Sequence, residues 1–276
     1  QNDYPYESST TKTGRLHFDQ FGESVVQKAE LNSDDLVIDI GSNVGVLLGA
    51  YQKRGCKVLG IEPSTHIAES ANHSGVETIN DFISVDLAKK IISNHGKATV
   101  INITNVFAHI HDLDGLMESI DMLLTKNGMF IIEAPHFLNL IEGLVYDTIY
   151  HEHLLYISVK PLNSLFNRFG FEVFDVNEVS IHGGSIRIFI CRKGEHKLNN
   201  SVNQIFEKEE KANLFDISRL NKFSEEVYEH KKQLRNLLLE IKKDGKTIAA
   251  VSAPAKGMTL LNYCEIDSNI IDFITE

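Results

Sequence analysis

Short apolar runs alternate with amphipathic stretches through the first half of the chain. Each run ends in a polar or glycine-containing turn, as buried strands do, and the stretches between them have helical spacing. The predicted strands lie within 36–40, 57–62, 76–80, 98–110 and 129–135, and the clearest helices within 46–55, 65–74 and 113–128. Strands that alternate with helices at this spacing predict a parallel, doubly wound sheet.

The pattern changes after residue 158. Residues 159–170 predict a helix with a glycine stop, and 171–194 predict two long strands around "HGGS", an antiparallel hairpin on the edge of the sheet. A helical region follows over roughly 201–243, and 246–276 has the order strand, turn, helix, strand. The helical region carries apolar residues at intervals that predict a packed face: Ile217, Leu220, Phe223, Val227, Leu234, Leu237 and Ile241.

These patterns predict an α/β fold in three parts. Residues 1–30 form an N-terminal cap segment, and residues 31–198 form the doubly wound, Rossmann-like domain with its edge hairpin. Residues 199–276 form a helix and a partial C-terminal α/β unit.

Composition narrows the class of partner. The 276 residues carry a formal net charge of −11, which argues against nucleic acid binding. No run approaches the roughly 18 apolar residues that span a bilayer, and no signal peptide is visible, so no membrane partner is expected. The three cysteines lie far apart, which excludes a disulfide framework and favours a reducing cytoplasm.

A cofactor signal begins where the first strand meets the first helix. The turn runs Asp39-Ile-Gly41-Ser42-Asn43-Val-Gly45, and its glycines let the backbone approach a ligand closely. The spacing is GxxxG, which differs from the GxGxxG of dinucleotide-binding proteins and disfavours a nicotinamide oxidoreductase.

Polar residues also follow the next strands. Glu62 ends the second strand, where a carboxylate can accept hydrogen bonds from both ribose hydroxyls. Asp81 and Phe82 follow the third strand, where an acid and a backbone N–H can read an adenine edge. Asn105 ends the fourth strand, where it can either contact the methionine part of a cofactor or shape the floor of the site. Together these residues predict S-adenosyl-L-methionine bound in a class I methyltransferase sheet.

The stretch "TIYHEHLLYIS" places Tyr150, His151, Glu152 and His153 in four consecutive positions between apolar residues. Such side chains are costly to bury without partners. Two imidazoles and a carboxylate can bind a metal, an imidazole can transfer protons near neutral pH, and a polar loop can have no chemical role. The residues alone leave these three alternatives open.

The motifs "DYPYESS", "DIGSNVG", "GIEPS", "NDF", "FAHI", "YHEH", "IHGGSIR" and "APAKGMTLLNYC" occur in an order that resembles the nucleotide-sugar C-methyltransferases. That family also has an N-terminal zinc domain with four cysteines and a longer C-terminal domain, which this sequence is expected to lack. Its turn before "PAKG" commonly has glycine where Ser252 stands here.

The resemblance implies methyl transfer to a ring carbon next to the keto group of a dTDP-linked 4-keto-6-deoxysugar, without a metal. It implies that His153 is the general base, with Glu152 orienting it or binding a sugar hydroxyl. Tyr150, His109 and Tyr4 would line the keto sugar and donate hydrogen bonds to developing negative charge. The residues expected to meet the sugar or its phosphates are His182, Gly183, Gly184, Arg187 and Lys256.

Other functions fit parts of this pattern. An O- or N-methyltransferase acting on a nucleotide sugar or glycan needs no enolate but still profits from a base. A catalytically idle module that binds sugar nucleotides would need no base at all. The expected assembly is a monomer or a homodimer.

Overall fold

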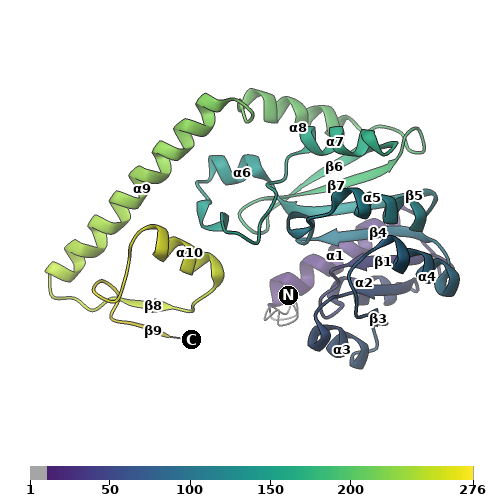
Figure 1. Ribbon diagram of the computed structural model, residues 1–276, viewed down its shortest axis with the longest axis horizontal. Helices are drawn as coiled ribbons and strands as arrows, with labels where there is room; N and C mark the ends of the chain where they lie inside the picture. Colours follow the sequence, from purple (N-terminus) through teal and green to yellow (C-terminus); the bar gives the residue numbers. More distant parts are fainter. Residues whose placement is uncertain (1–10, 276) are drawn as a thin grey trace.

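The computed structural model describes residues 11–275 and is built around one seven-stranded sheet (Figure 1). The strand order is β3-β2-β1-β4-β5-β7-β6. The strands are β1 (Leu36–Ile40), β2 (Lys57–Ile61), β3 (Thr78–Ile79), β4 (Ala98–Thr104), β5 (Leu124–Pro135), β6 (Phe171–Val179) and β7 (Ser185–Arg192). The first five are parallel, and β7 and β6 add an antiparallel hairpin at one edge, as predicted.

Helices cover both faces of the sheet, and for this reason its central strands are mostly apolar, with buried polar residues at Asp39, Asn102 and Glu133. One face packs against α4 (Val85–His95), α5 (Leu113–Leu123), α7 (Val159–Arg168) and α8 (Asn200–Lys211). The other packs against α1 (Lys12–Lys28) and α2 (Val46–Gln52), where Phe21 and Tyr51 are buried. Because β1 to β5 are parallel, the turns that follow them all lie at the same edge of the sheet.

The strand order reverses between β1 and β4, whose neighbours β2 and β5 lie on opposite sides. In open α/β sheets, ligands bind outside the carboxyl ends of the strands at such a switch point. The turns after β1 and β4 are those in which the sequence placed its cofactor signal.

The C-terminal part stands away from the sheet (Figure 1). Helix α9 (Ile217–Lys243) runs outward, and β8 (Ala249–Val251), α10 (Ala255–Tyr263) and β9 (Phe273–Thr275) lie beside it. Strands β8 and β9 are parallel neighbours, which confirms the predicted βαβ unit. A small apolar cluster joins this unit to the segment before the "YHEH" stretch: Tyr146, Val227, Cys264, Ile266 and Ile270.

Four further short elements complete the described part of the chain. Helix α3 (Thr65–His73) follows β2, and α6 (Phe137–Glu142) follows β5. Two short 3₁₀ helices, η1 (Phe107–His109) and η2 (Tyr146–Thr148), carry the segments around His109 and before Tyr150.

Two local predictions were wrong, and a third is confirmed only in part. The helix expected over 113–128 ends at Leu123, because Leu124 pairs with Ala98 and extends β5. The single helical region becomes α8 and α9, with Asn213 between them in the left-handed conformation at φ 52°. The expected packed face of α9 is confirmed in part: Val227 is buried, and Phe223 and Leu234 pack against the same apolar cluster. Ile217 and Leu237, at 69% and 54% exposed, lie where no described element covers the helix.

Candidate active site

The turn after β1 is shaped by close contact with the turn after β4. Gly41 has a φ of +72°, and a Cβ there would lie 2.5 Å from Cγ2 of Val106. Its N–H donates to the Ile61 carbonyl at 2.7 Å, which ties the turn to the end of β2. Gly45, at φ +78°, has a similar restriction against Val76. Only glycine therefore fits this turn without displacing its neighbours.

Glu62 holds this edge of the sheet together. Its side chain is almost fully buried, and it accepts hydrogen bonds from the N–H groups of Asn43 at 3.0 Å and Ser64 at 2.9 Å. A carboxylate offers about four acceptor sites, so both oxygens can still accept from ribose hydroxyls.

Asp81 and Phe82 make a local turn on the rim. The Asp81 carboxylate accepts from the Phe82 N–H at 2.8 Å, and the Phe82 ring is 54% exposed. The amide expected to read the adenine edge is thus engaged by the neighbouring carboxylate, and the exposed Phe82 ring is the larger surface that this rim offers to a base.

Unpaired polar atoms gather at the switch point. Among the described residues, six buried side-chain atoms lack a hydrogen-bond partner, and five of them belong to β1, β4 or the turns that follow: Asp39 Oδ1, Ser42 Oγ, Asn102 Nδ2, Thr104 Oγ1 and Asn105 Oδ1. Burial, and then the negative charge of Glu62, raises the pKa of the Asp39 carboxyl well above its ordinary value. Unpaired buried groups are costly, so their concentration marks a ligand site.

These residues fit S-adenosyl-L-methionine. The glycine turn, Ser42 and Asn105 would hold its methionine part, Glu62 its ribose, and Asp81 and Phe82 its adenine. Asn105 is fixed in the left-handed conformation at φ 57°, with its N–H donating to the Glu133 carbonyl at 2.8 Å.

His153 is held by the backbone of its own loop. Its Nδ1 lies 2.7 Å from the Thr148 carbonyl. Because a carbonyl can only accept, Nδ1 carries the proton, and the neutral ring presents a lone pair at Nε2. Burial lowers the pKa of His153 below its ordinary value, and the nearby His109 and Lys256 add to the effect. The backbone of its own loop therefore holds His153 in the tautomer that leaves Nε2 unprotonated in the neutral ring.

His109 and Tyr150 flank His153. The ring centroids of His109 and His153 are 5.0 Å apart, and those of Tyr150 and His153 are 4.3 Å apart. His109 Nδ1 donates to the Glu152 carbonyl at 2.8 Å, so neutral His109 presents an acceptor at Nε2 and donates there only as the imidazolium. The Tyr150 hydroxyl is the neutral donor of the group.

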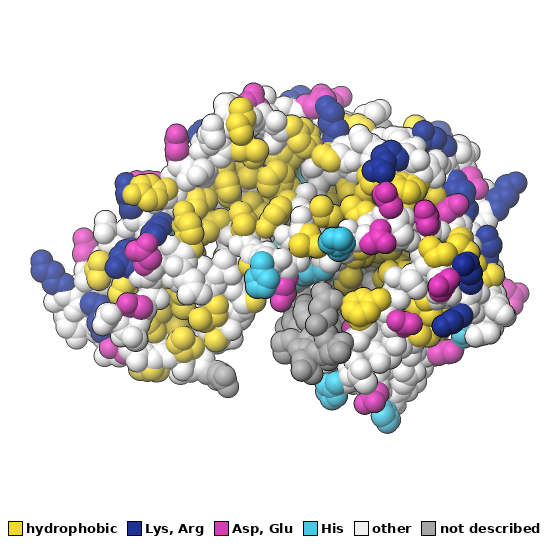
Figure 2. Space-filling model, in the orientation of Figure 1, with side chains coloured by type: hydrophobic (Ala, Val, Ile, Leu, Met, Phe, Trp, Pro, Cys, Tyr) yellow, Lys and Arg dark blue, Asp and Glu magenta, His cyan; other side chains and the backbone are white. Residues whose placement is uncertain are grey.

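The structure gives no comparable position beside His153 to the side chains of the remaining described residues in and near the "YHEH" cluster. The Glu152 side chain is exposed, and its backbone orients His109, whereas the Thr148 carbonyl orients His153. His151 is exposed. Tyr4 lies outside the described residues. Histidine side chains gather at the middle of the face shown in Figure 2, between the sheet and the C-terminal unit.

The "HGGS" turn approaches the same region. His182, Gly183 and Gly184 all have positive φ, at 52°, 81° and 109°. Burial by the surrounding protein, and then Lys256, lowers the pKa of His182. Since Lys256 also acts on His153, the start of α10 brings one cation close to both histidines.

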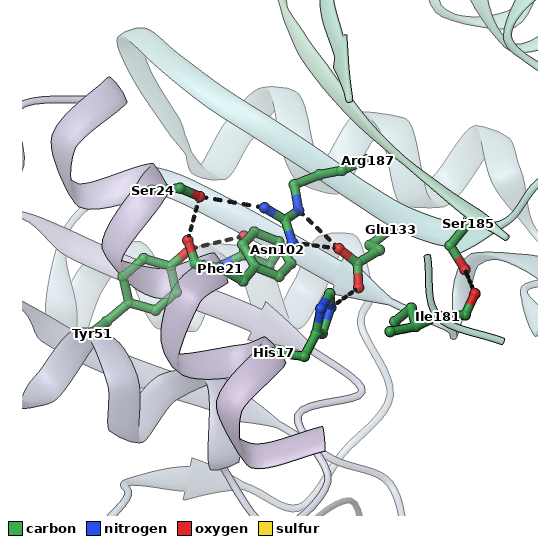
Figure 3. Close-up of polar contacts among 9 residues, drawn as sticks. All are labelled: His17, Phe21, Ser24, Tyr51, Asn102, Glu133, Ile181, Ser185 and Arg187. Carbon is green, nitrogen blue, oxygen red and sulfur yellow. Dashed lines mark hydrogen bonds and ion pairs between the residues drawn. The ribbon is translucent and has the colours of Figure 1, made fainter. Parts of the chain in front are cut away.

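Arg187 lies in a buried polar centre that the sequence did not reveal (Figure 3). Its guanidinium pairs with Glu133 at 2.7 Å, stacks on the Phe21 ring at 3.5 Å and donates to Ser24 at 3.3 Å. The other Glu133 oxygen lies 2.5 Å from His17 Nε2. Glu133 is completely buried, so Arg187 is committed to this ion pair rather than presented to a substrate. The only sequence signal was a carboxylate in an otherwise apolar strand.

Neither a metal-binding cluster nor a membrane-spanning helix occurs within residues 11–275. Within that range, no group of three or more His, Cys, Asp or Glu side chains is arranged to hold a metal ion. None of the described helices combines the length and hydrophobicity that a bilayer crossing needs.

The sequence resembles known methyltransferases over most of its length. Residues 18–176 match a family model described as "Methyltransferase domain", and residues 180–276 match one described as "C-methyltransferase C-terminal domain". The chain is 31% identical over 274 residues to C-methyltransferase NovU of Streptomyces niveus. That alignment covers 99% of this chain and 65% of the relative, so the chain spans less than two thirds of the relative's length.

Solved structures confirm the predicted fold class. The PH0226 protein of Pyrococcus horikoshii OT3 has a TM-score of 0.54 at 15% identity, covering 69% of this chain and 96% of its own. Magnesium protoporphyrin IX methyltransferase of Synechocystis PCC 6803, with bound SAH, has a TM-score of 0.50 at 16% identity, covering 68% and 90%. At these identities the likeness shows the fold alone, a class I methyltransferase sheet.

Proposed function

The chain belongs to the family of the methyltransferase domain, and from that premise we propose that it methylates a carbon next to the keto group of a nucleotide-activated keto-deoxysugar. The domain is S-adenosyl-L-methionine-dependent, and that cofactor supplies the methyl group when bound. The match of residues 180–276 to a C-methyltransferase C-terminal domain supports carbon as the acceptor rather than oxygen or nitrogen.

Methylation at carbon needs a base, because the ring carbon must first lose a proton. A neighbouring ketone makes that proton acidic by receiving the electron pair as an enolate. His153 Nε2 takes the proton, since Nδ1 is already committed to the Thr148 carbonyl. This fixed tautomer, which presents Nε2 as the base, is the observation that carries the proposal.

The enolate oxygen needs a hydrogen-bond donor. The Tyr150 hydroxyl fills this role beside His153, and the His109 ring accepts from a sugar hydroxyl at Nε2 while it is neutral. A donor placed where negative charge develops stabilises the transition state more than the ground state.

The nucleotide diphosphate requires positive charge, which the acidic chain as a whole does not supply. Lys256 at the start of α10 provides it, and His182, Gly183 and Gly184 form the facing turn. The predicted cytoplasmic location, the monomer or homodimer, and the domain division at 198–199 stay predictions.

His153→Ala tests the base directly. We expect turnover on keto sugars to fall by about 10² to 10⁴-fold, as for loss of a positioned base, while cofactor affinity stays within a few-fold. His151→Ala, which removes the exposed neighbouring imidazole, is the matched control and should keep parental turnover.

A second measurement separates the reaction classes. With S-adenosylhomocysteine in place of the methyl donor, the parent should wash deuterium out of the ring carbon, and His153→Ala should not. Methyl transfer without washout would instead indicate an O- or N-methyltransferase. Tight cofactor binding with neither activity would indicate an idle binding module.

The acid limb of the pH profile is also set by this residue. Because the pKa of His153 lies below its ordinary value of 6.5, the base stays neutral to lower pH. The acid limb of kcat/KM should therefore have its midpoint below 6.5, and a midpoint above that value would contradict the assigned environment.

A further inference from the structure

The sixth unpaired buried atom, His136 Nδ1, lies away from the cofactor turns. His136 follows the last residue of β5, and its N–H donates to the Gly184 carbonyl at 3.0 Å. Its side chain is completely buried and meets the equally buried Glu209 of α8, with Nε2 2.9 Å from Oε1.

Glu209 decides which nitrogen of His136 carries the proton. The carboxylate also accepts from the N–H groups of Val159 at 2.7 Å and Lys160 at 3.1 Å, and so caps the first turn of α7 in place of Ser158, whose side chain makes no cap. With Glu209 acting throughout as an acceptor, His136 donates from Nε2. In the neutral ring its Nδ1 then carries a lone pair.

That lone pair needs a donor. No described residue donates to Nδ1, and an unsatisfied buried acceptor is costly. His136 lines a cavity of about 10 Å³, together with Thr148, His182 and the two glycines of the "HGGS" turn. This is room for one water-sized group with polar neighbours.

We propose that this cavity is a hydroxyl site, in which His136 Nδ1 accepts a hydrogen bond from one O–H group. The donor is an ordered water or a hydroxyl of the bound sugar. The site adjoins the loop of residues 148–153. Thr148 lines the cavity and also supplies the carbonyl that holds His153.

The position suggests a consequence for substrate selection. A buried acceptor that is satisfied by a substrate hydroxyl rejects the analogue that lacks it, because the acceptor is then left unpaired. If water fills the site in both states, His136 instead supports the loop without reading the sugar.

The free protein tests the site without any assumption about the reaction. Nitrogen-15 NMR should show His136 as the tautomer protonated at Nε2, and a crystal structure of the free protein should show a water oxygen within hydrogen-bond distance of Nδ1. A proton on Nδ1, or a protein atom bonded to it, would overturn the proposal.

Two variants separate the nitrogens of His136. His136→Gln keeps an amide donor toward Glu209 but loses the acceptor toward the cavity, so the water should disappear. His136→Asn keeps an acceptor near the place of Nδ1 but loses the donor toward Glu209, so the water should remain. The reverse pattern would count against the hydroxyl site, and His73→Gln, on the exposed end of α3, should leave the water in place.

An experiment with sugar substrates identifies the donor, and it is the one test of this site that depends on the proposed function. Two keto sugars that differ by one ring hydroxyl are compared by kcat/KM. A preference of about tenfold or more that is lost in His136→Gln identifies the sugar as donor, and an unchanged ratio identifies water. If the parent methylates neither sugar, the proposed function fails, while the NMR and crystal results still decide the site.

Discussion

Two regions lie at the same edge of one sheet: the turns after β1 and β4, and the Glu133 centre. They differ in whether their buried polar atoms have hydrogen-bond partners. In the first region Asp39, Ser42 and Asn105 each keep a buried atom unpaired among the described residues. In the second, both oxygens of the completely buried Glu133 are bonded, one to His17 and the other to Arg187.

The difference separates a ligand site from a scaffold. Unpaired groups lower the stability of the free protein and gain partners when a ligand binds. Paired groups keep their geometry whether or not a ligand is present. Glu133 joins α1, β5 and β7 through its side chain and holds Asn105 through its backbone carbonyl. The paired region therefore fixes the position of a residue in the unpaired region.

Removing the cation from the paired region should have the largest effect on stability. In Arg187→Leu, Glu133 keeps its buried charge without its guanidinium partner, and the free energy of unfolding should fall by about 3–5 kcal/mol. Chemical denaturation measures it. The double variant Glu133→Leu/Arg187→Leu should recover much of the loss, because no buried charge remains. A double variant less stable than Arg187→Leu alone would contradict this expectation, because Glu133 would then stabilise the fold without Arg187 through its remaining partner His17.

Sequence predicted these two regions unequally. The turns after β1 and β4 could be predicted as a ligand site because their glycines and acids stand next to the strands that position them. The Glu133 centre could not, because His17 lies 116 residues and Arg187 54 residues from Glu133 along the chain, and no local pattern links them. Arg187 was therefore assigned to the substrate.

The loop of residues 148–153 shows the same limit of sequence-based prediction over a shorter stretch of chain. The "YHEH" cluster drew attention to His153 and Tyr150, but the group that fixes the tautomer of His153 is a backbone carbonyl, which no side-chain pattern encodes. Likewise, the periodicity of α9 predicted an apolar face, but the tertiary fold decides which part of that face is covered: Val227 is buried, whereas Ile217 is 69% exposed.

A methyl group at Gly41 should damage the unpaired region. Gly41→Ala adds the cost of a left-handed backbone, about 1–2 kcal/mol, to a clash with Val106 from the neighbouring turn. Gly75→Ala is the matched control, because Gly75 has a φ of +83° with nothing near the added Cβ. Calorimetric titration with S-adenosylhomocysteine should show weaker binding only for Gly41→Ala. Equal loss in both variants would mean that backbone strain, and not the contact between the turns, controls cofactor affinity.

Asp39→Asn should move stability and binding in opposite directions. The amide removes a buried carboxyl whose ionisation is disfavoured, so the free protein should gain about 1 kcal/mol at neutral pH. Affinity for S-adenosylhomocysteine should fall about tenfold, because the site loses a charged acceptor. Thermal unfolding with and without ligand measures both effects, and a variant destabilised in the free state would show that Asp39 serves the scaffold.

The pH dependence of that gain is the smallest effect and gives the sharpest comparison of the two regions. The folded-state pKa of Asp39 is raised above its ordinary 3.8, so its contribution to stability is fully present below pH 3.8 and is lost as pH rises toward the raised value. The advantage of Asp39→Asn over the parent should therefore be small at pH 4 and grow toward pH 7. Chemical denaturation across that range measures it. A constant difference would mean that the pKa of Asp39 is not raised in the folded state, and the opposition between unpaired and paired carboxylates would then rest on hydrogen bonds alone.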